Sequence, residues 1–196
     1  MMKRREEILT FILPEMEQLF AKRAEKISAL CEENPEQFVA DCLTPFVELF
    51  ARGIQLQQEG RKGEIHYLYI SHLTSSILTG SYQLRLDLYN HLFLLDEEEV
   101  SNYWTVPYVF DTFTDDLQTL EDSIKKNFIR LRFFEMEYIK LNYAKYHYVL
   151  ISNLLRELAD VIDAVGESLV KSEEYKILFG ELWGECVTIY PAKEQA

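Results

Sequence analysis

The chain has 196 residues, of which 48% are hydrophobic and 27% are charged, and this ordinary globular composition excludes an intrinsically disordered protein. Its net charge of −13 argues against sequence-independent nucleic-acid binding, which depends on Lys and Arg neutralising phosphates, and against adsorption to anionic lipid. We therefore expect a single domain over residues 1–196, with neither nucleic acid nor membrane as a partner.

Cysteine usage and hydropathy indicate the compartment. The three cysteines are odd in number and form no Cys-x-x-Cys pair, which disfavours both a disulfide framework and a zinc ribbon. The basic start at residues 3–5 is followed by no apolar run long enough for a signal peptide, and no stretch suits a transmembrane helix. These features predict a cytoplasmic protein with reduced thiols.

Two amphipathic helices are predicted in the first third of the chain. Apolar residues spaced by threes and fours from Ile8 to Leu30 predict the first helix, which Pro14 either starts or kinks. Asn34 and Pro35 offer an N-cap and a first-position proline, so the second helix is expected to begin at Pro35.

Residues 64–79 follow a Gly-rich turn and fit two structures. Ile65, Tyr67 and Tyr69 alternate as in a strand, but the apolar positions of the segment also fit a helix. Gly80 suits the position just after a helix C-terminus, and this favours the helix.

Residues 81–89 form the clearest strand pattern, because Leu84, Leu86 and Leu88 alternate with polar residues. Residues 92–95 are then predicted as the return strand of a hairpin. A hairpin is marginally stable alone, so residues 186–190, with their strand-like composition, are the candidate third strand.

The other segments fit helices. Asp96 followed by three glutamates predicts a short helix over residues 96–103, and Ser172 begins a last helix that ends near residue 183. Thr105 is the expected N-cap of a helix over residues 106–127. The apolar spacing continues beyond it without Gly or Pro, so whether it joins the next helix stays open, and we place a turn near residues 126–127 because one continuous helix is too long for a compact domain.

The longest helical pattern covers residues 128–165 and is the expected scaffold of the fold. Its apolar positions fall seven residues apart, at Phe134, Leu141, Tyr148, Leu155 and Ile162. A straight helix of this length would span roughly 57 Å, and a compact chain of this size is about 42 Å across. We therefore expect a kink or break near residues 142–145.

These elements together predict a mainly α fold. We expect a single-domain bundle of six or seven helices, with a small antiparallel β element formed by strands near 81–89, 92–95 and 186–190.

No motif for catalysis, metal binding or phosphate binding is found. The four histidines lack the Glu-x-x-His spacing of a bundle metal site, and the seven glycines form no phosphate-binding loop. Of Asp111, Asp115 and Asp116, the first two share one helix face and could hold Mg²⁺ with a substrate phosphate, but a solvated acidic face is the favoured interpretation. We expect no catalytic residue, no metal and no cofactor.

Two clusters are candidate binding sites. Arg85 and Asp87 lie on the outer face of the predicted strand, with Tyr89, Tyr103 and Trp104 close in sequence, and an Arg beside aromatic rings can hold a carboxylate or a planar ligand.

The second cluster lies on the long helix, where Tyr138 and His147 belong to a group of rings that surrounds the helix. Aromatic residues on all sides of a helix indicate burial on most sides or contact with a partner.

Two functions are compatible with these features. The first is a non-catalytic cytoplasmic regulatory or adaptor protein that docks a protein partner, or a second copy of itself, through an aromatic-rich surface. The alternative is a small-ligand sensor or an enzyme with a pocket lined by Tyr and Trp, in which Arg85 grips an anion.

Overall fold

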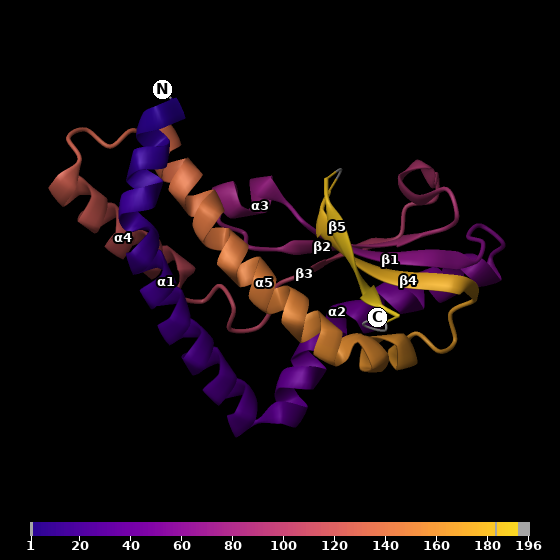
Figure 1. Cartoon of the computed structure of the whole chain (residues 1–196). Helices are drawn as coiled ribbons and strands as arrows, with labels where there is room; N and C mark the ends of the chain where they lie inside the picture. Colours follow the sequence, from indigo (N-terminus) through magenta and orange to yellow (C-terminus); the bar gives the residue numbers. More distant parts are fainter. Residues whose placement is uncertain (1, 183, 192–196) are drawn as a thin grey trace, which may run out of the picture.

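The computed structural model describes residues 2–182 and 184–191, which contain five α-helices, one 3-10 turn and a five-stranded mixed sheet. The expected bundle of six or seven helices is wrong, because the fold combines helices with a full sheet (Figure 1). In chain order the elements are α1 (Met2–Glu33), α2 (Pro35–Gln58), β1 (Ile65–His72), α3 (Thr74–Thr79), β2 (Leu84–Tyr89), η1 (Phe93–Leu95), β3 (Ser101–Trp104), α4 (Phe113–Asn127), α5 (Phe133–Val165), β4 (Lys171–Glu181) and β5 (Cys186–Tyr190).

The sheet has the strand order β3-β2-β1-β4-β5, with β1 at its centre. β1 pairs antiparallel with β2 and parallel with β4, and the two outer pairs are antiparallel. The parallel pair brings Tyr69 opposite Leu178 and His72 opposite Glu181. Segments far apart in the chain therefore meet at the centre of the sheet.

The two faces of the sheet differ in chemistry. The inner face is apolar, and Gly53 of α2 lies so close to it that an added Cβ would come 2.8 Å from Leu88 Cδ1. The outer face is polar and aromatic, and there Phe93 of η1 packs its ring against the rings of three strand tyrosines. The buried inner-face residues are Leu68, Ile70, Leu84, Leu86, Leu88, Ile177 and Phe179.

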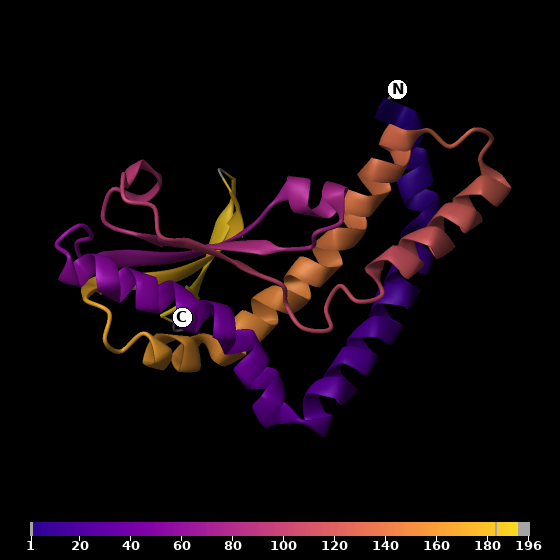
Figure 2. The ribbon, with the colours of Figure 1, turned by 180° about the vertical axis from the view of Figure 1, so that it is seen from behind.

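Three helices, α1, α4 and the first half of α5, pack against one another beside the sheet. α1 and α2 form a V whose vertex is Asn34, and α1 lies beside α4 and the first half of α5 (Figures 1 and 2). The second half of α5 continues past α2 towards β5. α5 therefore belongs to both the helical side and the sheet side of the molecule, as expected of a scaffold helix.

The expected helix over residues 64–79 is wrong for most of its length. Residues 65–72 form β1, which is buried between two neighbouring strands, so apolar side chains occupy both faces and weaken the period-two signal. Gly80 does end a helix, with a φ of 82°, but that helix is the six-residue α3.

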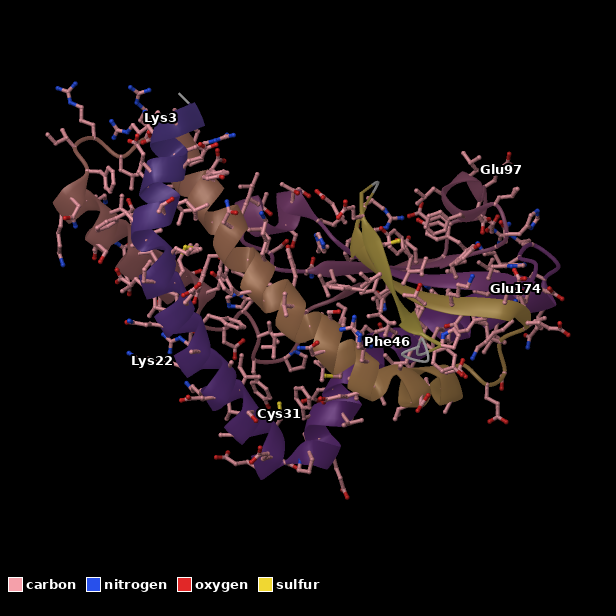
Figure 3. All side chains as sticks on the ribbon, in the orientation of Figure 1. Lys3, Lys22, Cys31, Phe46, Glu97 and Glu174 are labelled. Atoms are coloured by element: carbon pink, nitrogen blue, oxygen red, sulfur yellow. The ribbon has the colours of Figure 1, made fainter. Side chains whose placement is uncertain are left out.

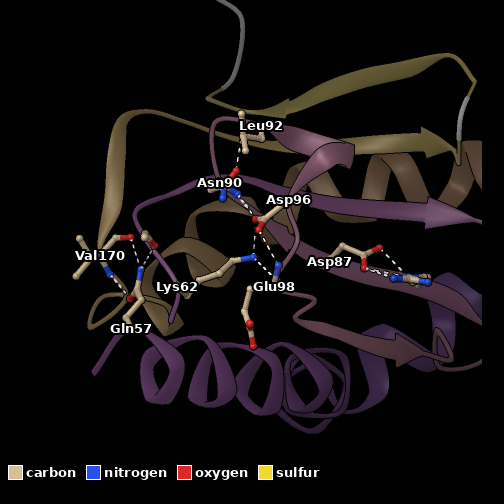
Figure 4. Close-up of polar contacts among 10 residues, drawn as sticks. Gln57, Lys62, Asp87, Asn90, Leu92, Asp96, Glu98 and Val170 are labelled. Carbon is tan, nitrogen blue, oxygen red and sulfur yellow. Dashed lines mark hydrogen bonds and ion pairs between the residues drawn. The ribbon is translucent and has the colours of Figure 1, made fainter. Parts of the chain in front are cut away.

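The prediction for residues 92–103 is also wrong. Residues 92–95 contain the turn η1 instead of a strand, and the expected helix is a loop followed by β3. The Asp96 carboxylate accepts hydrogen bonds from the backbone N–H groups of Asn90 and Glu98 and pairs with Lys62 Nζ at 2.6 Å (Figure 4). The short Asp96 side chain can accept hydrogen bonds from nearby N–H groups in a helix cap or in a tight loop, which is why the sequence suggested a helix here.

The expected helix over residues 172–183 is the strand β4 as far as Glu181, and residue 183 lies outside the described residues. Tyr175, Ile177 and Phe179 alternate as strand residues do, but the acidic residues before them resemble a helix start. Pairing with β1 on one side and β5 on the other fixes the strand.

The helix boundaries after residue 104 are partly as predicted. α4 begins at Phe113 instead of residue 106, because the chain turns at Tyr108, whose φ is 65°. The turn near residues 126–127 is confirmed, since α4 ends at Asn127. Of the kink or break expected at residues 142–145, the break is wrong, because α5 is helical without interruption from Phe133 to Val165.

Other predictions are confirmed. α2 begins at Pro35, residues 84–89 form a strand with Leu84, Leu86 and Leu88 on its buried face, and residues 186–190 form β5. β5 pairs with β4 and not with the predicted hairpin.

Candidate functional site: a cleft between α5 and the β4–β5 hairpin

An open cleft of about 580 Å³ lies between α5 and the β4–β5 hairpin. One wall is the α5 face that carries Tyr138, Leu141 and Val149, and the opposite wall comes from the ends of β4 and β5. Its volume falls in the range of sites that bind small molecules or side chains of a partner. The residues that line the cleft are His72, Thr74, Tyr138, Leu141, Asn142, Lys145, Tyr148, Val149, Ser152, Phe179, Gly180, Glu181, Glu185 and Val187.

The innermost part of the cleft is aromatic. The His72 imidazole stacks on the Tyr148 ring at 4.1 Å between centroids, and Phe179 meets His72 edge to face at 5.8 Å. Burial lowers the pKa of His72, against a smaller opposing effect of Glu181, and burial raises the pKa of Tyr148. At neutral pH both groups are therefore uncharged, and they present flat ring surfaces to the cleft.

The hairpin wall depends on Gly180. A Cβ at this position would lie 2.3 Å from the Glu185 carbonyl oxygen and 2.5 Å from Cys186 Cα, so no larger residue fits without moving β5. Gly180 thus lets the two strands approach closely and leaves backbone, not side chain, on that part of the cleft wall.

The rim of the cleft carries charges of both signs. Lys145 on α5 is exposed and donates a hydrogen bond to Asn142 Oδ1 at 3.0 Å. Glu181 and Glu185 are exposed on the opposite wall. An apolar interior with a few charged groups at the edge is typical of sites where polar contacts fix the orientation of a bound apolar group.

A second hollow of about 250 Å³ lies on the other side of the same ridge of α5, against α1. Three residues line both hollows, namely Asn142, Lys145 and Val149. Val149 is 62% exposed, so this ridge presents an apolar side chain to solvent between two depressions. The far side of the second hollow comes from Leu9, Leu13 and Met16 of α1.

The predicted cluster around Arg85 is divided between the two faces of the sheet. Arg85, Asp87 and Tyr89 share the outer face, as expected, and Tyr103 lies opposite Arg85 on β3. Trp104 points to the inner face, where it is 1% exposed and meets the Phe46 ring at 5.2 Å. No tryptophan therefore stands beside Arg85 in the described part of the chain.

The Arg85 guanidinium is already engaged by acids. It donates from Nε to Asp87 Oδ1 at 2.9 Å and from Nη2 to Glu99 Oε1 at 2.8 Å. Burial raises the pKa of Asp87, and Arg85 acts in the opposite direction by stabilising the carboxylate. An anionic ligand would have to displace these carboxylates to reach the guanidinium.

His147 lies away from the cleft, in a sealed aromatic cluster on the other side of α5. Its ring stacks on Phe110 at 5.1 Å, meets Phe113 and Tyr143 edge to face at 5.0 Å each, and is 1% exposed. Burial lowers its pKa to about 4, so the imidazole is neutral at physiological pH. It contributes to the core and has no access to a ligand.

The structure therefore does not bring all the site residues predicted from sequence into one site. Tyr138 lines the cleft, and the Arg5 guanidinium lies 4.6 Å from its ring centroid. Sequence reasoning missed His72, Glu181 and Glu185, which meet α5 only through the β1–β4 and β4–β5 pairing. The local signal that pointed to the cleft was the run of tyrosines on α5, which includes Tyr148.

Among residues 2–182 and 184–191, no group of three His, Cys, Asp or Glu side chains is placed to hold a metal ion. Within the same part of the chain, no helix combines the length and apolar content needed to cross a bilayer. Comparison of the chain with protein-family models, curated proteins and solved structures gives no match.

Proposed function

We propose that the protein is a non-catalytic cytoplasmic binding protein whose cleft between α5 and the β4–β5 hairpin receives an apolar segment of a protein partner. The open cleft of about 580 Å³ carries the proposal, because it offers an aromatic interior with a charged rim. The three cysteines are free thiols, as suits a reducing compartment.

The shape of the site supports a segment of a partner as its occupant. The cleft and the smaller hollow against α1 lie on either side of Val149, so an extended or helical segment that crosses α5 can place one apolar side chain in each. Lys145 lies between the two hollows, and Glu181 and Glu185 lie on the opposite wall, so a partner with charges of both signs would be held in one orientation.

The alternative, a small-ligand sensor or an enzyme with Arg85 as an anion grip, has weaker support. The cleft includes neither Arg85 nor His147. Arg85 is paired with two carboxylates, and Trp104 faces away from it.

Selection of displayed random peptides tests the proposal. Peptides are selected on the wild-type protein alone and are then measured on Val149→Glu, which places a charge on the exposed ridge between the two hollows. We expect the surviving peptides to share apolar or aromatic anchor residues and to bind Val149→Glu at least about tenfold more weakly in isothermal titration, a loss of about 1.4 kcal/mol.

Val47→Glu is the matched control, because Val47 is 50% exposed on α2 and does not line the cleft. It should bind the same peptides as tightly as the wild type. Peptides that bind Val149→Glu and the wild type equally would contradict the proposed site. Light scattering that reveals a dimer, abolished by Val149→Glu, would identify the partner segment as part of a second copy.

A further inference from the structure

The connection between α4 and α5 exposes two large apolar side chains at one end of the molecule. Ile129 is 84% exposed and Phe133 is 80% exposed. The loop lies beside the start of α1, so both segments share this end (Figure 1). We call residues 3–5 and 125–134 the basic tip.

The loop conformation is fixed by polar contacts to its backbone and to the buried Glu135 side chain. The Arg4 guanidinium donates to the carbonyl oxygens of Ile129, at 2.8 Å, and Arg130, at 3.3 Å, and it pairs with Glu135 at 2.9 Å. Glu135, whose side chain is 2% exposed, also accepts the Arg132 backbone N–H at 2.9 Å. Arg130 has a φ of 57°, which is unfavourable for a residue with a long side chain. A strained loop held by several contacts, yet directed outward with apolar side chains, is a feature that structural stability alone does not explain.

Basic residues surround these apolar side chains. Lys3, Lys126, Arg130 and Arg132 are all exposed at the basic tip, and none of the four forms an ion pair with another described residue. The apolar centre with a cationic surround matches the chemistry of an anionic lipid interface, where acyl chains lie beneath phosphate groups.

Acidic side chains lie at the end of the molecule opposite the basic tip. Figure 3 shows Lys3 at one end and Glu97 and Glu174 at the opposite end. Because screening limits electrostatic interactions to about 10 Å at moderate salt, a surface responds to the charges nearest to it and not to the net charge of −13. The acidic end would be repelled by an anionic surface, and the basic tip would face it.

We propose that the basic tip docks the protein onto a bilayer that contains anionic lipid. Ile129 and Phe133 enter the boundary between headgroups and acyl chains, and the four exposed bases contact lipid phosphates. A projecting apolar loop suits a bilayer, which yields around it, whereas a protein partner would need a concave site of matching shape. The proposal departs from the expectation drawn from the net charge of −13, because a bilayer would meet the basic tip and not the whole chain.

Vesicle sedimentation tests the proposal with the full chain. The probes are vesicles of phosphatidylcholine alone and of phosphatidylcholine mixed with phosphatidylglycerol. We expect the wild type to sediment with the mixed vesicles, and rising salt to release it. The double variants Ile129→Ser/Phe133→Ser and Lys126→Gln/Arg130→Gln should each bind at least about tenfold more weakly, because one removes the apolar contact and the other the phosphate contact.

Leu92→Ser/Leu95→Ser is the matched control, because these two side chains are 47% and 74% exposed in and next to η1, away from the basic tip. This variant should bind like the wild type, and unchanged urea midpoints would show that all three variants are folded.

Absence of wild-type binding at low salt would overturn the proposal, as would equal binding by the tip variants. A dimer in light scattering that Ile129→Ser/Phe133→Ser converts to a monomer would also overturn it, in favour of a protein occupant. These variants leave the cleft intact, so this test is independent of the peptide selection.

Discussion

His147 and Tyr148 are neighbours on α5, yet they belong to aromatic clusters with opposite properties. The sealed cluster of Phe110, Phe113, Tyr143 and His147 fills the space between α5 and the segment that leads into α4. The cleft cluster of His72, Tyr148 and Phe179 is stacked just as closely, but it borders open space.

The two clusters show that residue type alone does not define a binding site. Each contains a histidine that stacks on an aromatic ring with an interplanar angle of 15°. The difference lies in the neighbours, because helices pack over the sealed cluster and an open cleft lies between α5 and the β4–β5 hairpin beside the other. Stability and recognition should therefore respond differently to changes on the two sides of α5.

Truncation of a ring on each side should give the largest effect. Phe113→Ala should lower the free energy of unfolding by about 4 kcal/mol, because it leaves a cavity where no solvent can enter. Tyr148→Ala should cost about half as much, because its ring already borders an open cleft. Urea unfolding followed by circular dichroism measures both. Equal losses would show that the cleft closes in solution and would remove the distinction.

Removal of a charge should have the next largest effect, and only on the sealed side. Arg23 donates to Asp116, which is 0% exposed and also accepts the Tyr143 hydroxyl at 3.0 Å. Arg23→Met should therefore cost about 3 kcal/mol, since a buried carboxylate loses its counter-charge.

Glu181→Gln is the matched change on the cleft side. Glu181 is exposed, so the free energy of unfolding should change by less than about 0.5 kcal/mol. A large loss for this variant, or a negligible one for Arg23→Met, would be inconsistent with the contrast between the two sides.

The smallest of the three effects is a dependence on pH. Burial lowers the pKa of His147 from its ordinary 6.5 to about 4, so the unfolded chain binds the proton more readily than the folded chain. The stability associated with a neutral His147 is present above the ordinary pKa and is lost as the pH falls towards the folded value. Between about pH 7 and about pH 5, the wild type should lose roughly 2 kcal/mol from this group.

Urea unfolding at the two pH values, repeated with His147→Leu, isolates this contribution. The variant should lose roughly 2 kcal/mol less than the wild type over the same interval. His72→Leu should remove a smaller part, because His72 is less buried and Glu181 opposes the lowering of its pKa. Identical pH profiles for the wild type and His147→Leu would mean that the sealed cluster admits water.

Sequence reasoning succeeded where the signal is local. The proline at residue 35 and the alternating leucines of β2 act within a few residues and were interpreted correctly. Gly80 does end a helix, but only a short one, and Asn34 precedes α2 without a side-chain cap hydrogen bond. β1 and β4 were missed, because they pair with each other across a long stretch of sequence and apolar residues cover both faces of β1.

The candidate site depends on the same distant pairing. His72 and Glu181 become neighbours only when β1 and β4 lie parallel, so no spacing in the sequence could have placed them on one wall. Tyr138 and Tyr148 could be identified as unusual from α5 alone. Whether a ring is enclosed, as in the sealed cluster, or accessible, as in the cleft, is decided by tertiary packing.

The parallel pairing of β1 with β4 also affects how the protein is made. During synthesis, β1 and β2 can pair as soon as both have left the ribosome, but the other edge of β1 stays open until residues 171–181 emerge. Formation of this pair requires closure of a very long loop, which slows folding. In the interval, an apolar central strand presents unpaired N–H and C=O groups, and such an edge readily pairs with another chain. The chain should therefore be most prone to aggregation just before β4 is complete.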